Sequence, residues 1–382
     1  MKLSKNVPAF LLMLYTFQGG ASHGAEPRKD RRETYITFVS HRTGDNLLYR
    51  MRPDGSDCNP IFGGTIKDAP GIDDDFNLYR EPHWTWQSPD GKYFSSWAYD
   101  SLRPKNKVRA LSSSPPGPMF RMILGRSDGS GPVRILTPEC DEAVAWSPDS
   151  RRIAYGVFSE QRSTSAYPNP ARMTRIYVVA INATSEELIF EQPGVWRPMD
   201  WSIDGKKLLM IRSEILSTNF MLSDIVEIDM AKIEKIQQNP GRENPTKWQN
   251  HVTRFLIEPV LGDAATIKPE YARYSPDGKS IAVMGIHKED KPVNWKPLDF
   301  ELGIIDRGSS TYRKIAHYEA GLRGPLCWSP DGTEIVFSRP LEKGDDREKW
   351  DEEGSNGLEL WLIKSDGTDA RPLTTGWSPD WR

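Results

Sequence analysis

The residues of this chain that are best suited to metal binding or acid–base chemistry are far apart in the sequence. Histidine imidazoles bind a metal when two or three converge on one ion, and ligand sets commonly include closely spaced pairs. The histidines beyond the N-terminal segment show no such pairs: they are His41, His83, His251, His287 and His317. The sequence therefore predicts no catalytic residue, no metal site and no cofactor.

Candidate nucleophiles also lack the surroundings that their chemistry requires. The pattern G-x-S-x-G needs a strand-to-helix turn, but its two copies, at residues 20–24 and 125–129, fall in a predicted export signal and in a predicted strand hairpin. Cys58, Cys140 and Cys327 are odd in number and widely spaced, which favours neither a disulfide framework nor a metal-ligand set. We expect at least one buried thiol, with a single Cys58–Cys140 bridge as the alternative.

The overall composition limits the class of protein and of partner. The 382 residues are 37% hydrophobic and 27% charged, which indicates a globular chain with a sizeable core. A formal net charge of −3 and an isoelectric point near 6.1 favour neither nucleic acid nor an anionic membrane as partner. The 30 glycines and 30 prolines favour many short strands joined by turns.

The N-terminus contains the three parts of an export signal. Lys2 and Lys5 form a basic start, residues 7–17 form an apolar stretch too short to span a bilayer, and small residues at 19–24 offer a cleavage site. We predict that residues 1–25 are a signal peptide and that the mature chain is periplasmic or extracellular. No later apolar run is long enough for a membrane helix, so no stable membrane insertion is expected.

One short motif recurs along the rest of the chain. The segments AWSPDSRRIAYG at 145–156, RYSPDGKSIAVMG at 273–285 and CWSPDGTEIVFSR at 327–339 share an aromatic residue, a Ser-Pro-Asp turn and an apolar strand. Such self-similarity is typical of stacked supersecondary units, here about 58 residues long. The aligned turn aspartates are Asp90, Asp149, Asp204, Asp277, Asp331 and Asp380. The turn explains these aspartates, and we expect the aromatic residues to pack between adjacent units.

Each unit is predicted to contain four strands. The strand after the turn is followed by a segment that ends in Asp-Gly, such as FRMILGRSDGS at 120–130, and by a short closing strand, such as RPLTT at 371–375. The mature chain begins with the later strands of a unit and ends with the first strand of one, so its two ends together complete a unit. We predict an all-β, six-bladed β-propeller of four-stranded antiparallel blades over residues 33–382, closed by pairing of the N- and C-terminal strands.

The recurring W-S-P-D-G motif, followed by an apolar strand, D-G and L-T, resembles the repeat of the TolB-like (WD-repeat-like) propeller family across residues 33–382. The resemblance implies a periplasmic propeller that is non-enzymatic and acts by protein contact. TolB itself carries a domain before its propeller, whereas only a few residues here separate the expected cleavage site from the first strand; we therefore expect a relative and not TolB itself. The similar oligogalacturonate lyases hold a metal through several histidines.

Propeller topology predicts that the short turns lie on one face and the longer connections on the other. Variable loops on a rigid scaffold commonly carry binding sites, so we expect the site on this loop-rich face, at the mouth of the central channel. The longer connections are residues 62–83, 100–119, 159–172, 213–223, 257–270, 286–299 and 340–356. The predicted binding residues are Arg80, His83 and Trp84, in the segment YREPHWTW at 79–86, with Tyr99 and Asp100.

The sequence thus predicts an exported, non-catalytic scaffold that binds a protein or a cell-envelope glycan through its loop-rich face. We expect it to be a monomer that does not bind nucleic acid. The alternative is a metal-dependent polysaccharide lyase resembling oligogalacturonate lyase, which would require three of the histidines to converge in the folded chain.

Overall fold

The computed structural model describes residues 34–40, 42, 47–62, 78–79, 84–100, 120–128, 130, 134–137, 141–160, 172–183, 186–217, 220–231, 252–255, 267–287, 299–318, 325–340 and 358–381. The chain from Thr34 to Arg382 forms one compact unit. Within the described ranges, no helix has the length and apolar character of a membrane span. The predicted signal peptide at residues 1–25 lies outside the described residues.

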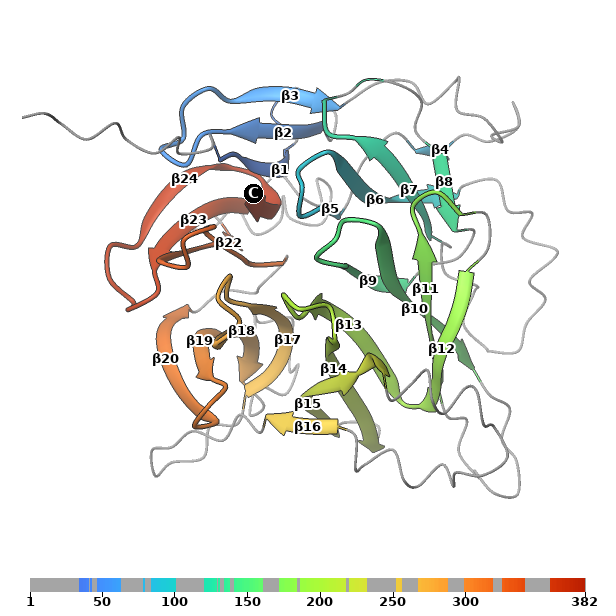
Figure 1. Ribbon diagram of the computed structural model, residues 1–382. Helices are drawn as coiled ribbons and strands as arrows, with labels where there is room; N and C mark the ends of the chain where they lie inside the picture. The colour runs from blue at the N-terminus through green and yellow to red at the C-terminus, as the bar shows by residue number, and fades with distance from the viewer. Residues whose placement is uncertain are drawn as a thin grey trace, which may run out of the picture. The chain divides into compact units, whose positions relative to one another are not determined.

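Six antiparallel sheets, which we call blades, are arranged around a common centre (Figure 1). From the centre outward, blade 1 contains β25 (Trp377–Trp381), β1 (Ile36–Ser40), β2 (Leu47–Met51) and β3 (Asn59–Phe62). Blade 2 contains β4 (Leu78–Tyr79), β5 (Thr85–Gln87), β6 (Tyr93–Asp100), β7 (Phe120–Arg126) and β8 (Arg134–Thr137). Blade 3 contains β9 (Asp141–Trp146), β10 (Arg152–Glu160), β11 (Arg172–Ala180) and β12 (Glu186–Pro193).

The remaining three blades repeat this order. Blade 4 contains β13 (Val195–Trp201), β14 (Lys207–Ser217), β15 (Phe220–Asp229) and β16 (Val252–Phe255). Blade 5 contains β17 (Ile267–Tyr274), β18 (Ser280–His287), β19 (Phe300–Asp306) and β20 (Thr311–Tyr318). Blade 6 contains β21 (Cys327–Trp328), β22 (Glu334–Pro340), β23 (Leu358–Lys364) and β24 (Arg371–Thr375).

The innermost strands contact one another in sequence around the ring, from β25 to β5, β9, β13, β17, β21 and back to β25. The predicted all-β, six-bladed propeller is therefore confirmed. Blade 2 differs in one detail: β4 and β5 both pair with β6, so its innermost position is shared by two short strands.

The two ends of the chain close the ring as predicted. Strand β25 pairs antiparallel with β1, and Trp381 lies opposite Ile36. In the same way, the aromatic residue before the turn in blade 4, Trp201, lies opposite Leu208. Trp381 is therefore the structural counterpart of Trp201, and the chain reaches the turn position of blade 1 only after the SPDW segment.

The assignment of Asp380 as a sixth turn aspartate is consequently wrong. Asp380 lies within β25, is buried, and accepts the backbone N–H of Gln87 in the next blade at 2.7 Å. Its counterpart is Asp200, which accepts the backbone N–H of Tyr274 in the next blade at 2.9 Å. The segment SPDW resembles the turn motif SPDG in sequence, but it forms part of strand β25. Only the pairing register distinguishes the two.

The aromatic residues before the turns pack between blades, as predicted. The indole N–H of Trp146 in blade 3 donates to the backbone oxygen of Trp86 in blade 2 at 3.2 Å. Trp328 in blade 6 makes the equivalent bond to Arg273 in blade 5 at 3.1 Å. In blade 5 the aromatic residue is Tyr274, whose hydroxyl donates to buried Glu227 of blade 4 at 2.9 Å. Burial and this carboxylate raise the pKa of the Tyr274 phenol well above its usual range.

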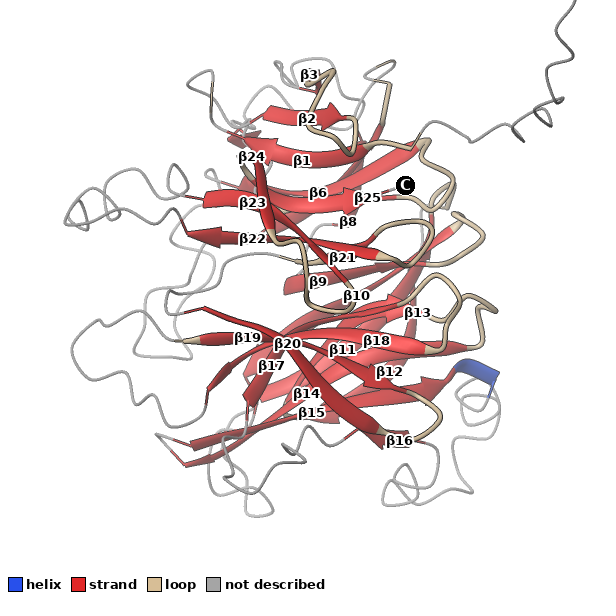
Figure 2. Ribbon diagram, turned by 90° about the vertical axis from the view of Figure 1, so that its left-hand side faces the viewer, coloured by secondary structure: helices blue, strands red, loops and turns tan. Residues whose placement is uncertain are grey.

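The turn aspartates have a structural role in each described copy. In blade 5, the hydroxyl of Ser275 donates to Asp277 Oδ1 at 2.7 Å, and the same oxygen accepts the backbone N–H of Lys279 at 3.0 Å. The Ser275 hydroxyl also accepts the backbone N–H of Ser280 at 2.9 Å, which fixes the start of β18. The same Ser–Asp bond occurs in blades 2, 3, 4 and 6. These turns gather at one end of the strands (Figure 2).

Two predicted connections have different lengths in the structure. Residues 213–223, predicted as a long loop, mostly belong to β14 and β15, which pair across a tight hairpin from Ser217 to Phe220. In contrast, β15 ends at Asp229 and β16 begins at Val252, so the link between them is long although it lies at the turn end of the blade. Apolar residues at 208–211 and 215–216 allow β14 to continue, and no Asp-Gly pair follows β15 to close a short turn.

The cysteines are thiols in the described part of the chain. Cys58 is a free cysteine that accepts a hydrogen bond from Arg42 Nη1 at 3.0 Å, so the alternative of a Cys58–Cys140 bridge is not realised. Cys327 is buried in β21, which confirms the expected buried thiol. Cys140 lies outside the described residues.

Replacing Trp381 with alanine should weaken ring closure. The Trp381 side chain is buried against Ile36, Phe38 and Met51 of the first two strands. We expect a loss of about 3–5 kcal/mol in the free energy of unfolding, measured by urea denaturation. The control is Leu188→Ala, because Leu188 is 40% exposed on β12. Equal stability of the two variants would contradict a closing role for β25.

The Ser–Asp turns should make the fold sensitive to acid. The Ser275 hydroxyl and the Lys279 backbone N–H hold the pKa of Asp277 below its ordinary value of 3.8. A carboxylate with a lowered folded-state pKa stabilises the fold above its unfolded-state pKa, and this stabilisation is lost as the pH falls through the folded-state value. We expect the urea concentration at the unfolding midpoint to decrease as the pH is lowered below about 4. Between pH 5 and pH 3 this decrease should be smaller in Asp277→Asn than in the wild type. An unchanged pH dependence in the variant would contradict this assignment.

Candidate functional site

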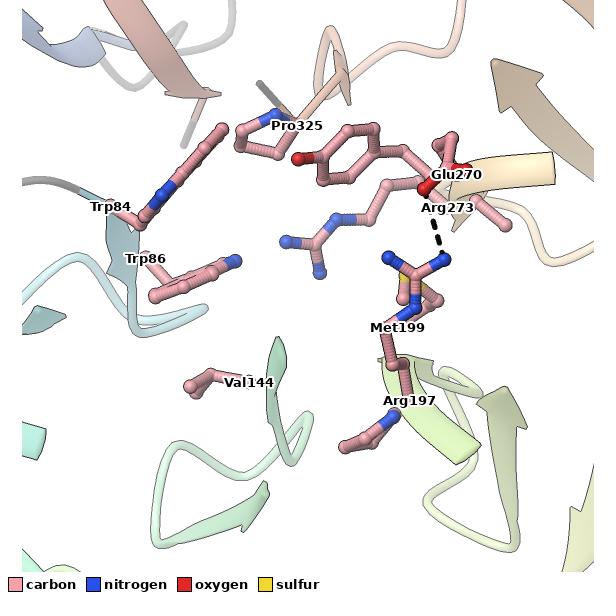
Figure 3. Close-up of a pocket in the computed structure, with 11 residues that line it drawn as sticks. Trp84, Trp86, Val144, Arg197, Met199, Glu270, Arg273 and Pro325 are labelled. Carbon is pink, nitrogen blue, oxygen red and sulfur yellow. Dashed lines mark hydrogen bonds and ion pairs between the residues drawn. The ribbon is translucent and has the colours of Figure 1, made fainter. Parts of the chain in front are cut away.

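A cavity of about 180 Å³ lies among the innermost strands. Five of the six blades contribute to its wall, through β5, β9, β13, β17 and the residue that precedes β21. The lining residues are Trp84, Trp86, Val144, residues 197–199, residues 270–273 and Pro325. Figure 3 shows Arg197 and Arg273 pointing from their strands into the central space, with Trp84 and Trp86 on the other side of it. The cavity therefore occupies the central channel of the propeller.

The position of the cavity follows from the repeat. Every lining residue precedes the turn serine of its own blade by two to five positions, so the wall is one layer of the ring. Trp84 and Pro325 precede β5 and β21, at the end of these strands opposite the Ser–Asp turns. Successive side chains of a regular strand point to opposite faces. Consecutive residues can therefore line the same cavity only where the strand pairing is irregular. The register shifts next to Pro198 and Pro269 provide it.

One carboxylate in the wall is matched by two cations. Glu270 Oε2 lies 3.1 Å from Arg197 Nη2, and Glu270 Oε1 lies 3.0 Å from Lys268 Nζ. The side chains of Glu270 and Arg197 are only 17% and 12% exposed. At this burial an unmatched charge would be costly, so the pairs are needed to hold these residues in the channel.

The second arginine of the wall has a looser ion pair. Arg273 Nη1 lies 3.4 Å from Asp200 Oδ1, and the Arg273 side chain is 13% exposed. The two oxygens of Asp200 already accept the backbone N–H groups of Trp201 and Tyr274, each at 2.9 Å. Asp200 therefore joins blades 4 and 5 and also pairs directly with Arg273.

Aromatic side chains from opposite blades meet across the ring. The rings of Trp84, before β5 of blade 2, and Tyr271, on β17 of blade 5, have centroids 6.1 Å apart and an interplanar angle of 32°. Blades 2 and 5 face each other across the ring (Figure 1). Both residues line the cavity, so this contact gives the site an aromatic wall next to its charged wall.

The structure describes the predicted binding residues only in part. Trp84 lies in the cavity wall. Tyr99 and Asp100 end β6, where their backbones pair with Tyr79 and Leu78, and their side chains lie outside the description. Arg80 and His83 lie outside the described residues. Among the residues whose side chains the structure describes, the predicted site and the cavity therefore have Trp84 in common.

Sequence reasoning missed the charged residues of the cavity. Arg197, Glu270 and Arg273 lie in innermost strands whose other residues are largely apolar. A charged residue within five positions of the turn serine is the signal that marks them, because that part of each strand faces neighbouring blades or the channel. The segments VWRPMDW at 195–201 and IKPEYARY at 267–274 carry this signal.

The described residues contain no group of three or more His, Cys, Asp or Glu side chains placed to hold a metal. His317 lies near Asp299, with 3.9 Å between Nε2 and Oδ2, on the outer strand β20. His41, His83 and His251 lie outside the described ranges. The convergence of histidines that the lyase alternative requires is thus not seen in the part of the chain that the structure describes.

Comparison with known proteins supports the fold. TolB from Acinetobacter baumannii superposes with a TM-score of 0.55 over 91% of this chain and 66% of its own length, at 14% sequence identity. Oligogalacturonate lyase from Vibrio parahaemolyticus aligns at a TM-score of 0.46, with 11% identity, over 89% of this chain and 74% of its own. The chain thus spans about two thirds of the TolB chain that it resembles.

In sequence, the uncharacterized protein Atu1656 of Agrobacterium fabrum is 22% identical over 234 residues, which cover 57% of this chain and 71% of that protein. No family model matches the chain. The chain is therefore similar in fold to the six-bladed propeller of TolB.

Removing the carboxylate of Glu270 should destabilise the channel wall. In Glu270→Gln, Arg197 and Lys268 lose their shared counter-charge, and we expect a loss of about 1.5–3 kcal/mol in the free energy of unfolding. The matched control is Glu191→Gln, because Glu191 pairs with Arg175 at 2.8 Å where both side chains are at least 40% exposed. The control should lose less than about 1 kcal/mol. A Glu270 variant no less stable than the control would show that the pairs in the channel are not structurally needed.

Proposed function

We propose that this protein is an exported, non-catalytic propeller that binds a protein or a cell-envelope glycan, with the central cavity as part of its binding site. The observation that carries the proposal is the cavity itself: residues of five blades line it, and they include aromatic rings and the arginines of β13 and β17. Concave sites that pair apolar surface with a few oriented polar groups are typical of ligand binding. Residues on paired strands hold such groups more precisely than loops do.

The ligand is proposed to enter from the end of the channel opposite the Ser–Asp turns. Trp84 and Pro325 lie at that end of the ring, and the long connections predicted from the sequence belong to it by topology. At the other end, the turns are held by short internal hydrogen bonds and by contacts between neighbouring blades. At Gly205, for example, a Cβ atom would lie 3.5 Å from Cγ of Pro148 in the previous blade.

The Ser–Asp turns support a non-catalytic reading of the aspartates. Each described turn aspartate accepts the hydroxyl of its own serine, so its carboxylate already has a structural task.

We propose a monomer without a resident cofactor, located in the periplasm or outside the cell. Metal-dependent cleavage of a polyuronate is the competing function that the following experiment separates.

Capture from a cell-envelope extract tests the binding function. Immobilised wild-type protein should retain a saturable partner, and Trp84→Ala should reduce its retention by about tenfold, because the channel wall loses an aromatic surface. The matched control is Ile203→Ala, because Ile203 is 63% exposed at the turn end of blade 4. We expect the control to retain the partner as the wild type does.

The same preparation separates binding from catalysis. Uronate oligomers incubated with the wild type and Mn²⁺ should show no new unsaturated ends, measured by ultraviolet absorbance. Metal-dependent cleavage would contradict the non-catalytic function. Equal loss of the partner in Trp84→Ala and Ile203→Ala would contradict the assignment to the channel.

A further inference from the structure

Three aromatic side chains of the cavity wall are held in place by the cores of their blades. Trp86 belongs to the hydrophobic cluster between blades 2 and 3, and Trp84 packs against that cluster. Tyr271 packs against the cluster between blades 5 and 6 and also contacts the ring of Trp84. All three residues line the cavity. Because packing fixes their orientation before a ligand arrives, these rings form a preorganised aromatic surface.

The same wall contains both a hydrogen-bond donor and a hydrogen-bond acceptor. Arg273 donates from Nη1 to Asp200 at 3.4 Å, and Figure 3 shows its guanidinium directed into the central space. A guanidinium carries five N–H donors, so Nε and Nη2 of Arg273 have donors to offer a ligand. The acceptor is Glu270: each of its oxygens pairs with one cation, and a carboxylate oxygen accepts more than one hydrogen bond. A ligand that uses the whole wall must therefore donate and accept hydrogen bonds.

We propose that the cavity binds one neutral sugar ring of a glycan, with a C–H face of the sugar against the aromatic side chains and its hydroxyl groups bonded to Arg273 and Glu270. This inference rests on the proposed binding function and names the chemistry of its ligand. A hydroxyl group both donates and accepts, so neighbouring hydroxyls of one ring match a guanidinium and a carboxylate together. The C–H groups carry partial positive charge, which the negative face of an aromatic ring attracts.

Other ligand chemistries use only part of this wall. An apolar side chain would contact the aromatic rings but would cover the donors of Arg273 without replacing their hydrogen bonds to water, which costs free energy. A charged ligand of either sign would share a small space with a like charge, either the carboxylate of Glu270 or the guanidinium groups of Arg197 and Arg273. A neutral ring with several hydroxyl groups avoids both costs.

The size of the cavity limits the ligand to one ring within it. A cavity of about 150 Å³ holds one benzene ring, so about 180 Å³ has room for one six-membered sugar ring. Trp84 and Pro325 line the cavity at the end opposite the Ser–Asp turns, so the remainder of a longer glycan would extend toward that end. We therefore expect the bound ring to be a terminal unit of the glycan.

Isothermal titration calorimetry with methyl glycosides tests the chemistry of the ligand. The neutral probes are the methyl glycosides of glucose, galactose, mannose and N-acetylglucosamine. The charged probes are the methyl glycosides of glucuronic acid and glucosamine, together with the acidic peptide N-acetyl-Ala-Ala-Glu-amide. We expect the wild type to bind at least one neutral glycoside with a Kd of about 1–10 mM, about tenfold more tightly than any charged probe. The proposal is overturned if no neutral glycoside binds or if a charged probe binds more tightly than all four.

Substitutions in the wall test where the sugar binds. Trp84→Ala should weaken binding of the best neutral glycoside by about tenfold, whereas Trp84→Phe should retain most of the affinity because it keeps an aromatic face. Arg273→Gln should also weaken binding by about tenfold, because the forked donors are lost. The matched controls are Ile203→Ala, at a side chain 63% exposed, and Arg126→Gln, at a side chain 51% exposed on β7.

Thermal unfolding verifies that each variant is folded. Unchanged affinity in Trp84→Ala, or equal loss in Trp84→Ala and Trp84→Phe, overturns the assignment to the aromatic wall. Unchanged affinity in folded Arg273→Gln overturns the assignment of the donor. If Arg273→Gln does not fold, the two Trp84 variants still decide whether the sugar binds in the cavity.

Partner capture separates this inference from the broader function. A saturating concentration of the best neutral glycoside should release the envelope partner from the immobilised wild type. If the partner stays bound, the inference fails although the protein binds a partner. If the wild type retains no partner from the extract, the proposed function fails, whatever the glycosides show in the calorimeter. Release by the glycoside supports both.

Discussion

Packing of each blade against the next is the constraint on which this structure depends. A single four-stranded sheet cannot bury both of its faces, and the hydrophobic clusters accordingly combine residues of adjacent blades, as where Tyr274 of β17 packs with Leu209 and Ile211 of β14. The ring is stable only when every blade has two neighbours. Strand β25 supplies the missing strand of blade 1, and this explains why residues more than 300 positions apart form one sheet.

The recurring polar contacts serve the same packing. Indole N–H groups reach across blade boundaries to backbone oxygens at 3.1–3.2 Å, and Asp200 and Asp380 accept backbone N–H groups of the following blade. These bonds satisfy donors that the stacking of sheets would otherwise leave buried without partners. They also fix how far one blade is rotated from the next, which sets the width of the central channel.

The channel wall differs from the apolar packing between blades because it contains charged side chains. Strands β13 and β17 place the charged residues Arg197, Glu270 and Arg273 around a shared space. Burying charged groups costs free energy unless each is matched; here Glu270 pairs with Arg197 and Lys268, and Arg273 pairs with Asp200. Ion pairs on paired strands that line a cavity are a reason to look for the ligand inside the channel and not only on its loops.

The repeat made the fold predictable because its signals are local: a Ser–Asp turn, a following apolar strand and an aromatic residue each follow from a few neighbouring letters. From these the blade number, the closing pair of strands and the packing of aromatics between blades were correctly predicted. The error at Asp380 and the missed Arg197, Glu270 and Arg273 have a common cause. Strand register decides which face of a strand meets the channel and which residues of distant blades come within ion-pair distance, and register is set by pairing between segments far apart in the chain. The amino-acid sequence by itself thus determined the repeating unit and the number of blades, whereas the tertiary structure alone decided that Arg197, Glu270 and Arg273 line one cavity.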